Sequence, residues 1–331
     1  MAKIEYLGKH ATISHLKKPE WQKVPYLKDN DGALPPLIIA VGDARRAARA
    51  VGVLNLQNVA PLHEHGEKLL GLTGRGRVDM LIGSFELDKK AIPLLIVETQ
   101  MGMSATEIIL REVLAHCSPE YKFAGTNIKT DGIYVIRAGT AGGINMADGS
   151  GAVIKLGDIV NASFSIGWSG AVIESLAGLD FFSDEVRSKF KKRWDELGLS
   201  WTDDGRFPLA QCSKELVNAI NTVSKDLGVR IVTGGNFSKD SLYAEIGAAQ
   251  FFELREKYNI MSTEMEQTAL LKLCAEFKEK GISVHGGLVS GILGILPESF
   301  AEGKDAEDKM KRAEEDALKV AAHALWHIVY R

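Results

Sequence analysis

Short apolar runs alternate with amphipathic segments along most of the chain. Apolar runs of about four to eight residues predict buried β-strands, because they are too short for buried helices. Such runs lie at 37–41, 80–87, 92–99, 133–136, 158–164, 229–233 and 283–289. The charged residues 88–90 predict a turn between the second and third runs, and the glycine-rich stretch 139–144 predicts another turn after the fourth.

Segments with helical periodicity lie between these runs. Apolar residues recur three or four positions apart along one face, which predicts amphipathic helices. These segments are 44–53, 182–197, 264–278 and 306–330, and the capping-box spacing of Ser104 and Glu107 predicts a further helix start. Strands separated by helices favour the α/β class, with a central mixed β-sheet flanked by helices. The 331 residues allow two domains, but one large domain also fits.

Composition narrows the classes of function. The chain is 45% hydrophobic and 25% charged, the balance of a folded soluble protein. Its 40 basic and 43 acidic residues give a net charge of -3, so we expect no nucleic-acid partner. No apolar run approaches the ~20 residues of a membrane helix, and the start lacks the apolar core of a signal peptide. Three widely spaced cysteines fit a reducing compartment, so we expect a cytoplasmic protein with no membrane partner.

Two predicted strand ends have groups suited to binding an anion. Ligands of parallel sheets collect at the carboxyl ends of strands. After the first strand, Gly42 allows close backbone approach and Arg46 offers a forked cation, although a plain turn with solvated arginines also fits. Arg137 ends another strand and is followed by Gly139 and Thr140, which is typical either of an anion site or of a structural salt bridge beside a turn.

A third candidate lies at residues 262–266, where Glu264 and Glu266 flank Met265. Acidic residues are favoured in the first turn of a helix by the helix dipole, which is one interpretation. The other is a carboxylate that binds a diol such as ribose while the thioether packs on the sugar. Neither a dinucleotide fingerprint nor a P-loop is present. His63, Glu64 and His65 lack further ligands nearby in the sequence, so no metal site is predicted.

Five motifs occur in one order between about residues 37 and 291: VGDARR, VETQMGMSATEIILREVL, VIRAGTAGGI, LGDIV and STEMEQTALL. With these motifs the chain resembles the nucleoside phosphorylase family and, more closely, its uridine phosphorylase branch. The resemblance implies a single α/β domain over residues 1–331 and reversible phosphorolysis of a nucleoside to free base and ribose 1-phosphate. Residues 1–30 are then an N-terminal extension, and 162–207 an insertion or a subunit-contact region.

The resemblance also implies roles for individual residues. Arg137 and Glu266 match the catalytic positions, with Arg137 as the main phosphate cation and Glu266 as the ligand of the ribose hydroxyls. The phosphate-binding set is Gly42, Arg46, Arg77, Arg137, Gly139 and Thr140, with Asp43 bracing the first loop. Arg77, or else Arg75, would come from a neighbouring subunit. Met265 matches the sugar site, Met103 and Ser104 pass near sugar and phosphate, and His15 or Tyr26 would meet the 5′-hydroxyl.

Base recognition departs from the family pattern. Uridine phosphorylases usually have a Gln-x-Arg pair where this chain has residues 241–247, so Gln250 and Arg255 are the candidate base-binding residues. The acid that purine enzymes place after a serine is missing at Ser290–Gly291. Uridine is therefore the expected nucleoside. The alternatives are a purine nucleoside phosphorylase or a catalytically silent relative that binds nucleoside and phosphate.

The same resemblance concerns cofactors and assembly. The expected small-molecule partners are a nucleoside and phosphate, and phosphate is a co-substrate. No organic cofactor is expected. A homo-oligomer is implied, either a dimer or a hexamer of dimers, and a structural cation at a subunit interface stays open.

Overall fold

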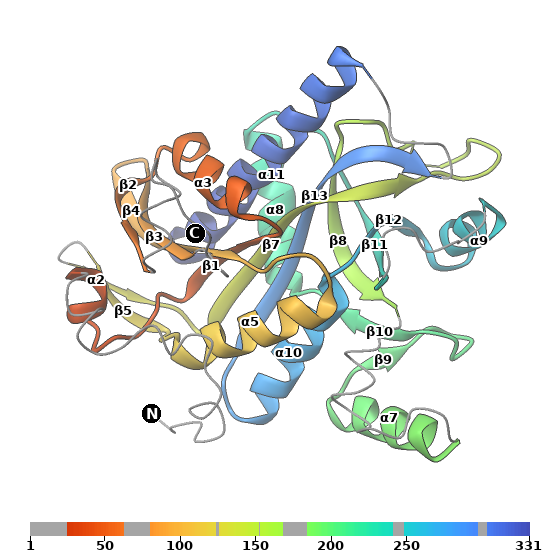
Figure 1. The fold of residues 1–331 in the computed structure, drawn as a ribbon, viewed down its shortest axis with the longest axis horizontal. Coiled ribbons are helices and arrows are strands. Elements are labelled where there is room, and N and C mark those ends of the chain that lie inside the picture. The colour runs from red at the N-terminus through yellow and green to blue at the C-terminus, as the bar shows by residue number, and fades with distance from the viewer. Residues whose placement is uncertain are drawn as a thin grey trace.

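The computed structural model describes residues 25–62, 80–123, 126–151, 153–167, 184–240, 248–296 and 303–331 (Figure 1). The helices are α2 (Pro25–Lys28), α3 (Ala44–Val53), α5 (Met103–His116), α7 (Asp184–Glu196), α8 (Lys214–Asp226), α9 (Ala248–Tyr258), α10 (Gln267–Glu279) and α11 (Lys304–Tyr330). The strands before residue 150 are β1 (Leu37–Val41), β2 (Gln57–Pro61), β3 (Met80–Leu87), β4 (Lys90–Glu98), β5 (Glu120–Phe123), β6 (Thr126–Lys129) and β7 (Ile133–Ile144). The later strands are β8 (Ile159–Ile166), β9 (Ser200–Trp201), β10 (Pro208–Gln211), β11 (Ile231–Ser238), β12 (Ile260–Glu264) and β13 (Val284–Leu296).

In the described part of the chain, 11 strands form one mixed sheet in the order β2-β3-β4-β1-β7-β12-β11-β8-β10-β9, and β13 pairs with both β7 and β8. The pairings β7–β12–β11–β8–β13–β7 therefore close a ring. Each of these strands gives a side chain to one apolar cluster: Ala141, Met261, Val232, Val160 and Ile292. The predicted single α/β domain with a central mixed sheet is confirmed.

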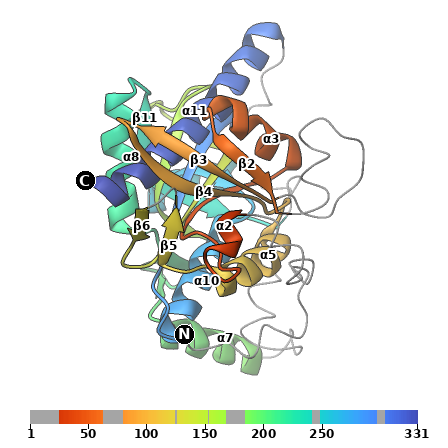
Figure 2. The same ribbon diagram turned by 90° about the vertical axis from the view of Figure 1, so that its left-hand side faces the viewer.

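Helices cover both faces of the sheet (Figures 1 and 2). Strand β1 shows why, because alternate residues of a strand point to opposite faces. Its odd-numbered residues pack with α3, α8 and α11, whereas Ile38 and Ala40 pack with α5 and α10. All of β1 is consequently buried, which explains its uninterrupted apolar sequence.

Several predicted elements are confirmed with the same bounds, among them the strand 37–41 and the helix 44–53. The turn predicted for 139–144 is wrong, because β7 continues through it to Ile144. The glycines there mark crowding. A Cβ at Gly142 would lie 2.8 Å from the side chain of Leu296, and one at Gly143 would lie 2.8 Å from that of Ile154. Glycine is needed where β13 and the segment between β7 and β8 approach β7 closely.

Two predicted helix starts differ from the structure. Helix α5 begins at Met103 after Gly102, whose φ of 95° favours glycine, so the capping box predicted at Ser104 is wrong. Helix α10 begins at Gln267, a few residues later than predicted, and follows the unpredicted strand β12. Because β12 reads Ile-Met-Ser-Thr-Glu, polar side chains interrupt the apolar pattern that would reveal a strand.

The 162–207 region begins inside β8, so its first residues belong to the central sheet. Its described remainder supplies α7 and β9. Phe190 and Trp194 of α7 are buried in a cluster with Ala210 of β10. A role as an insertion or a subunit contact stays a prediction, and most of the 1–30 extension lies outside the described residues. Among the described helices, none is both long and apolar enough to span a membrane.

Candidate active site

Arg137 is a buried cation near the middle of β7, only 4% exposed. Its Nη2 donates a hydrogen bond to Oε2 of Glu266, and its Nε lies 3.8 Å from Oε2 of Glu264. Within the described part of the chain, Nε and Nη1 have no hydrogen-bond partner. Buried donors without partners are costly unless a ligand satisfies them, so the side chain is suited to bind an anion.

The first predicted phosphate loop meets this arginine. Strand β1 ends at Val41, and Asp43 caps α3 by accepting a hydrogen bond from the backbone N–H of Arg46 at 2.9 Å. A Cβ at Gly42 would lie 3.6 Å from Nη1 of Arg46 and 3.7 Å from Nη2 of Arg137. Strands β1 and β7 are parallel neighbours in which Ala40 pairs with Arg137, so Arg137 lies level with the carboxyl end of β1 and both cations reach one glycine.

Gly139 lies under the same guanidinium. A Cβ there would be 1.8 Å from Nη1 of Arg137, so no larger residue fits this arrangement. Thr140 follows on β7, partly buried and paired with Gly291 of β13. Because neighbouring strand residues point to opposite faces, the Thr140 side chain lies across the strand from that of Arg137. The structure thus brings Gly42, Arg46, Arg137 and Gly139 together, whereas the side chain of Thr140 points to the other face of β7.

Glu266 connects three segments of the site. It is buried at the start of α10, where its Oε1 accepts a hydrogen bond from the backbone N–H of Gly102 at 2.8 Å. Its Oε2 accepts from Arg137 and from the backbone N–H of Met265 at 3.2 Å. Met265 itself is partly buried beside it. The predicted sugar pair therefore lies directly against the predicted phosphate cation.

Glu264 supports this arrangement from the end of β12. Its Oε2 accepts hydrogen bonds from the backbone N–H groups of Glu266 and Gln267, at 2.8 and 3.0 Å. Its Oε1 accepts from the side chains of Asn236 and Ser238, at 2.7 and 2.6 Å. Burial, together with the neighbouring charge of Glu266, raises the pKa of Glu264 to about 7, although Arg137 acts in the opposite direction.

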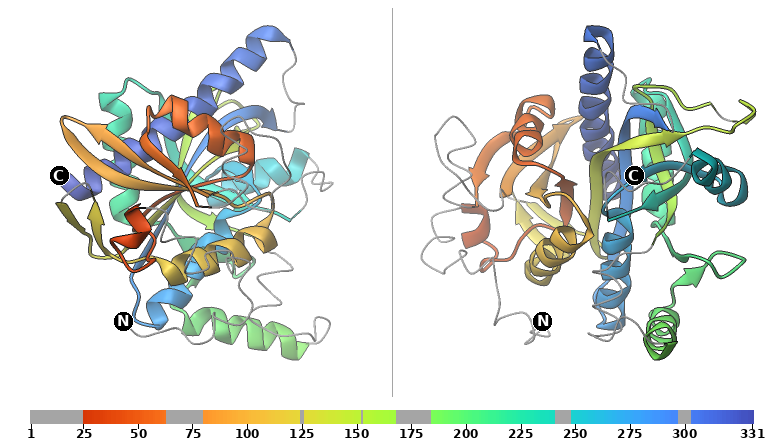
Figure 3. Two further views of the ribbon diagram at one scale, coloured as in Figure 1. Left: turned by 60° about the vertical axis from the view of Figure 1, so that its left-hand side comes forward. Right: turned by 45° about the vertical axis from the view of Figure 1, so that its right-hand side comes forward.

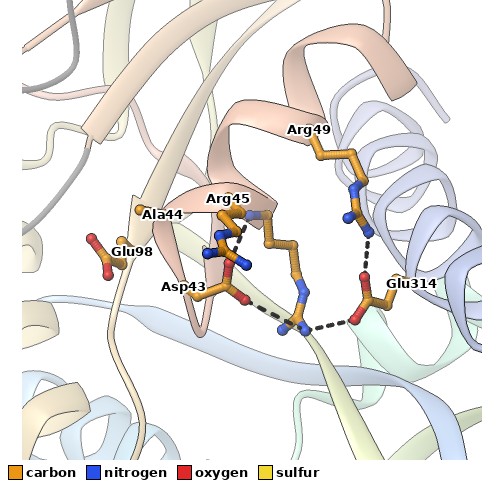
Figure 4. A pocket seen from close by; sticks show the side chains of 7 residues that line it. Asp43, Ala44, Arg45, Arg49, Glu98 and Glu314 are labelled. Carbon is orange, nitrogen blue, oxygen red and sulfur yellow. Dashed lines mark hydrogen bonds and ion pairs between the residues drawn. The ribbon is translucent and has the colours of Figure 1, made fainter. Parts of the chain in front are cut away.

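A cavity of about 490 Å³ opens beside Arg46 (Figure 4). Its lining residues are Asp43, Ala44, Arg45, Arg46, Arg49, Glu98 and Glu314. Glu314 of α11 accepts a hydrogen bond from Nη2 of Arg46 at 3.0 Å and from Nη1 of Arg49 at 2.5 Å. Glu314 and Arg49 are not among the site residues predicted from the sequence. No sequence pattern connects Glu314 in the last helix with Arg46, which lies 268 positions earlier.

The candidate base-binding residues lie on α9, which is on the opposite side of Figure 1 from α3. Gln250 is exposed at the start of this helix. Arg255 is 3% exposed, donates from Nη1 to Asn259 at 2.5 Å, and has Nη2 3.7 Å from the Cβ position of Gly151. Burial lowers the pKa of Arg255. These contacts hold Arg255 within its own helix and against the loop after β7.

Other predicted site residues are placed only in part. Met103 is the buried first residue of α5, and Ser104 is exposed in its first turn. Tyr26 belongs to α2. Three predicted residues and one segment lie outside the described residues: Arg75, Arg77, His15 and 241–247.

A large mixed sheet with helices on both faces, and two arginines that meet at the carboxyl end of β1, define an α/β fold with a candidate anion site. The chain belongs to the Phosphorylase superfamily, whose sequence model matches residues 50–325. This confirms the resemblance on which the residue roles depend.

Known relatives are distant in sequence. The DeoD-type purine nucleoside phosphorylase of Histophilus somni is 24% identical over 264 residues, which is 78% of this chain and 83% of that protein. The uridine phosphorylase of Vibrio fischeri ES114 has a similar structure, with a TM-score of 0.58, 19% identity, and coverage of 88% of this chain and 91% of that one. The Trypanosoma brucei nucleoside phosphorylase, described as showing uridine phosphorylase activity, has a TM-score of 0.59 and 16% sequence identity. The match covers 89% of this chain and 94% of that one. At these identities the structural likeness establishes the fold.

Proposed function

We propose that the protein cleaves the N-glycosidic bond of a nucleoside with inorganic phosphate, reversibly, and that uridine is its substrate. The products are then uracil and ribose 1-phosphate. The observation that supports this most directly is the meeting of Arg46 and Arg137 over Gly42, directly beside Glu266. Two forked cations next to a carboxylate suit a phosphate dianion held beside a sugar diol.

The chemistry follows from the charges. Breaking the glycosidic bond leaves an oxocarbenium-like sugar, whose positive charge a phosphate dianion beneath C1′ stabilises. Arg46 and Arg137 would hold that dianion in line, while Glu266 would accept hydrogen bonds from the 2′- and 3′-hydroxyls. Catalysis is then mostly positioning and electrostatic stabilisation. Water as nucleophile would leave both arginines without a role, so phosphorolysis is favoured over hydrolysis.

Residue 291 favours a pyrimidine base. Purine enzymes of this family have an acid there, but a Cβ at Gly291 would lie 2.9 Å from the backbone carbonyl carbon of Ala313 in α11. An aspartate at this place would require α11 to move. For uracil, the amide of Gln250 and the guanidinium of Arg255 complement the O4, N3–H and O2 edge. Since both lie on α9, their part in base binding depends on the approach of that helix to the sugar.

The purine alternative remains as a second candidate because of the Histophilus somni relative. Family membership also supports the remaining parts of the proposal. These are a cytoplasmic homo-oligomer, either a dimer or a hexamer of dimers, with Arg77 of one subunit reaching its neighbour's phosphate. No organic cofactor is needed for this chemistry. A catalytically silent binding protein is the third outcome that the test must distinguish.

Product analysis with uridine and with inosine, each with and without phosphate, tests the proposal. Uracil release that requires phosphate is the expected result. Hypoxanthine release would move the protein to the purine class, and base release without phosphate would make it a hydrolase. Binding of nucleoside and phosphate without any turnover would identify the silent relative. Loss of uridine affinity in Gln250→Ala at unchanged thermal stability would support that residue's role, and full affinity would remove it.

A further inference from the structure

We infer that Glu314 and Arg49 form a brace that positions Arg46 for phosphate, an inference that rests on the proposed function. The three side chains come from two helices that lie side by side, α3 and α11 (Figure 3). The carboxylate of Glu314 bridges the two arginines, with one oxygen 3.0 Å from Nη2 of Arg46 and the other 2.5 Å from Nη1 of Arg49. Figure 4 shows the side chains of Arg49 and Glu314 pointing toward each other and joined by an ion pair.

The brace occupies one end of the Arg46 guanidinium. Nη2 is held by Glu314, and Oδ2 of Asp43 lies 3.7 Å from it. The other end faces the anion site, since Nη1 lies 3.6 Å from the Cβ position of Gly42. Nε of Arg46 is buried and has no hydrogen-bond partner among the described residues. Arg46 therefore keeps Nη1 for a ligand near Gly42, while the contact of Nη2 with Glu314 fixes the direction of the guanidinium.

The charges of the three side chains explain why Arg49 is part of the brace. A lone carboxylate beside Arg46 would cancel its charge and repel an incoming dianion. Arg49 offsets that carboxylate, so the three groups together keep one net positive charge. The Arg46 and Glu314 side chains are 11% and 19% exposed, which limits solvent screening of their pair. Positions 46 and 49 are three apart on α3, and they therefore face α11 together.

Glu314 and Arg49 are thus positioning residues that act through Arg46. Four single variants test this: Glu314→Ala, Glu314→Gln, Arg49→Met and, as control, Glu315→Ala at the adjacent position on α11. The dissociation constant of inorganic phosphate is measured by calorimetry, and KM for phosphate and for the nucleoside by steady-state kinetics. Thermal unfolding of each variant reports whether the fold is intact.

Glu314→Ala and Arg49→Met should each weaken phosphate binding about tenfold, with the nucleoside KM within about twofold of wild type, since one charge-assisted contact is worth about this much. Glu314→Gln should stay within about threefold, because its amide oxygen still accepts from Arg46. Glu315→Ala should match wild type. Unchanged or tighter phosphate binding in Glu314→Ala would overturn the brace, as would equal changes in the phosphate and nucleoside constants.

The two proposals fail in different ways. Phosphate binding by wild type without turnover would contradict the phosphorylase function but leave the brace testable by calorimetry. Turnover that is insensitive to Glu314→Ala and Arg49→Met would contradict the brace alone. A wild-type protein that binds no phosphate would overturn both.

Discussion

The guanidinium of Arg137 lies where a side chain at residue 139 would have to stand. A Cβ at Gly139 would be 1.8 Å from Nη1 and 2.9 Å from Cζ of Arg137. Residues two apart on a strand share a face, so the arginine folds back along its own strand over the glycine. Because residue 139 has no side chain, the guanidinium of Arg137 has room to occupy this position.

Replacement of Gly139 by alanine should displace Arg137 from its place beside Glu266. A displacement of about 1 Å can cost about 100-fold in turnover, so kcat/KM should fall by about that factor. Gly52→Ala on α3 is the matched control, because a Cβ there meets nothing within 4 Å. Wild-type kcat/KM in Gly139→Ala would show that the Arg137 geometry is not needed.

Arg137 itself should be essential for phosphate. Arg137→Met should lower kcat/KM by about 10²–10³-fold, the usual cost of losing one preorganised donor to a charged transition state. It also leaves two buried carboxylates without a counterion, which costs about 3–5 kcal/mol of stability. Arg137→Lys keeps a charge and separates the two effects. If it folds as wild type does and turns over as fast, the fork of Arg137 has no catalytic role. Arg193→Gln at a solvent-exposed ion pair is the control.

Loss of the Glu266 carboxylate should lower kcat/KM most for substrates that have the ribose 2′- and 3′-hydroxyls. Glu266→Gln should reduce kcat/KM for uridine by about tenfold, since a charged hydrogen-bond acceptor is lost. The same variant should lose much less with 2′,3′-dideoxyuridine, which lacks both hydroxyls. The ratio of kcat/KM for the two substrates is the measurement. A ratio equal to that of wild type would place the diol elsewhere.

Glu264 should make stability fall as pH rises. Its folded pKa of about 7 lies above the usual glutamate value of 4.5, which applies to the unfolded chain. Between these values the native state binds more protons than the unfolded state, so the free energy of unfolding decreases with increasing pH. The contribution lost by pH 8 is about 3 kcal/mol, because each unit of pKa shift corresponds to about 1.4 kcal/mol. Urea unfolding of wild type and Glu264→Gln at pH 5 and pH 8 is the measurement: the free energy of unfolding of wild type should fall between these pH values by more than that of the variant. Parallel curves would contradict it.

The sequence predicted β1 with its observed bounds because this strand is buried on both faces and so reads as a plain apolar run. The predicted end of β7 was too early, but Arg137 still meets the end of β1 because it pairs with Ala40 in the parallel neighbour. The stretch 139–144 was misread because glycine marks both turns and crowded strands. Only the side chains that pack against these glycines, here Leu296 and Ile154, separate the two cases. The contact of Glu314 with Arg46 could not be predicted, because it depends on which helix packs against α3.

The Arg46–Glu314 pair also orders events during synthesis of the chain. The two residues are 268 positions apart, and chains emerge from the ribosome at about 5–20 residues per second. Arg46 is therefore exposed for many seconds before its carboxylate partner exists. The neighbouring strands can assemble in that interval, whereas the cation near Gly42 gains its final orientation only when the last helix docks. The candidate site can therefore be complete only after the last helix has been synthesised and has packed against α3.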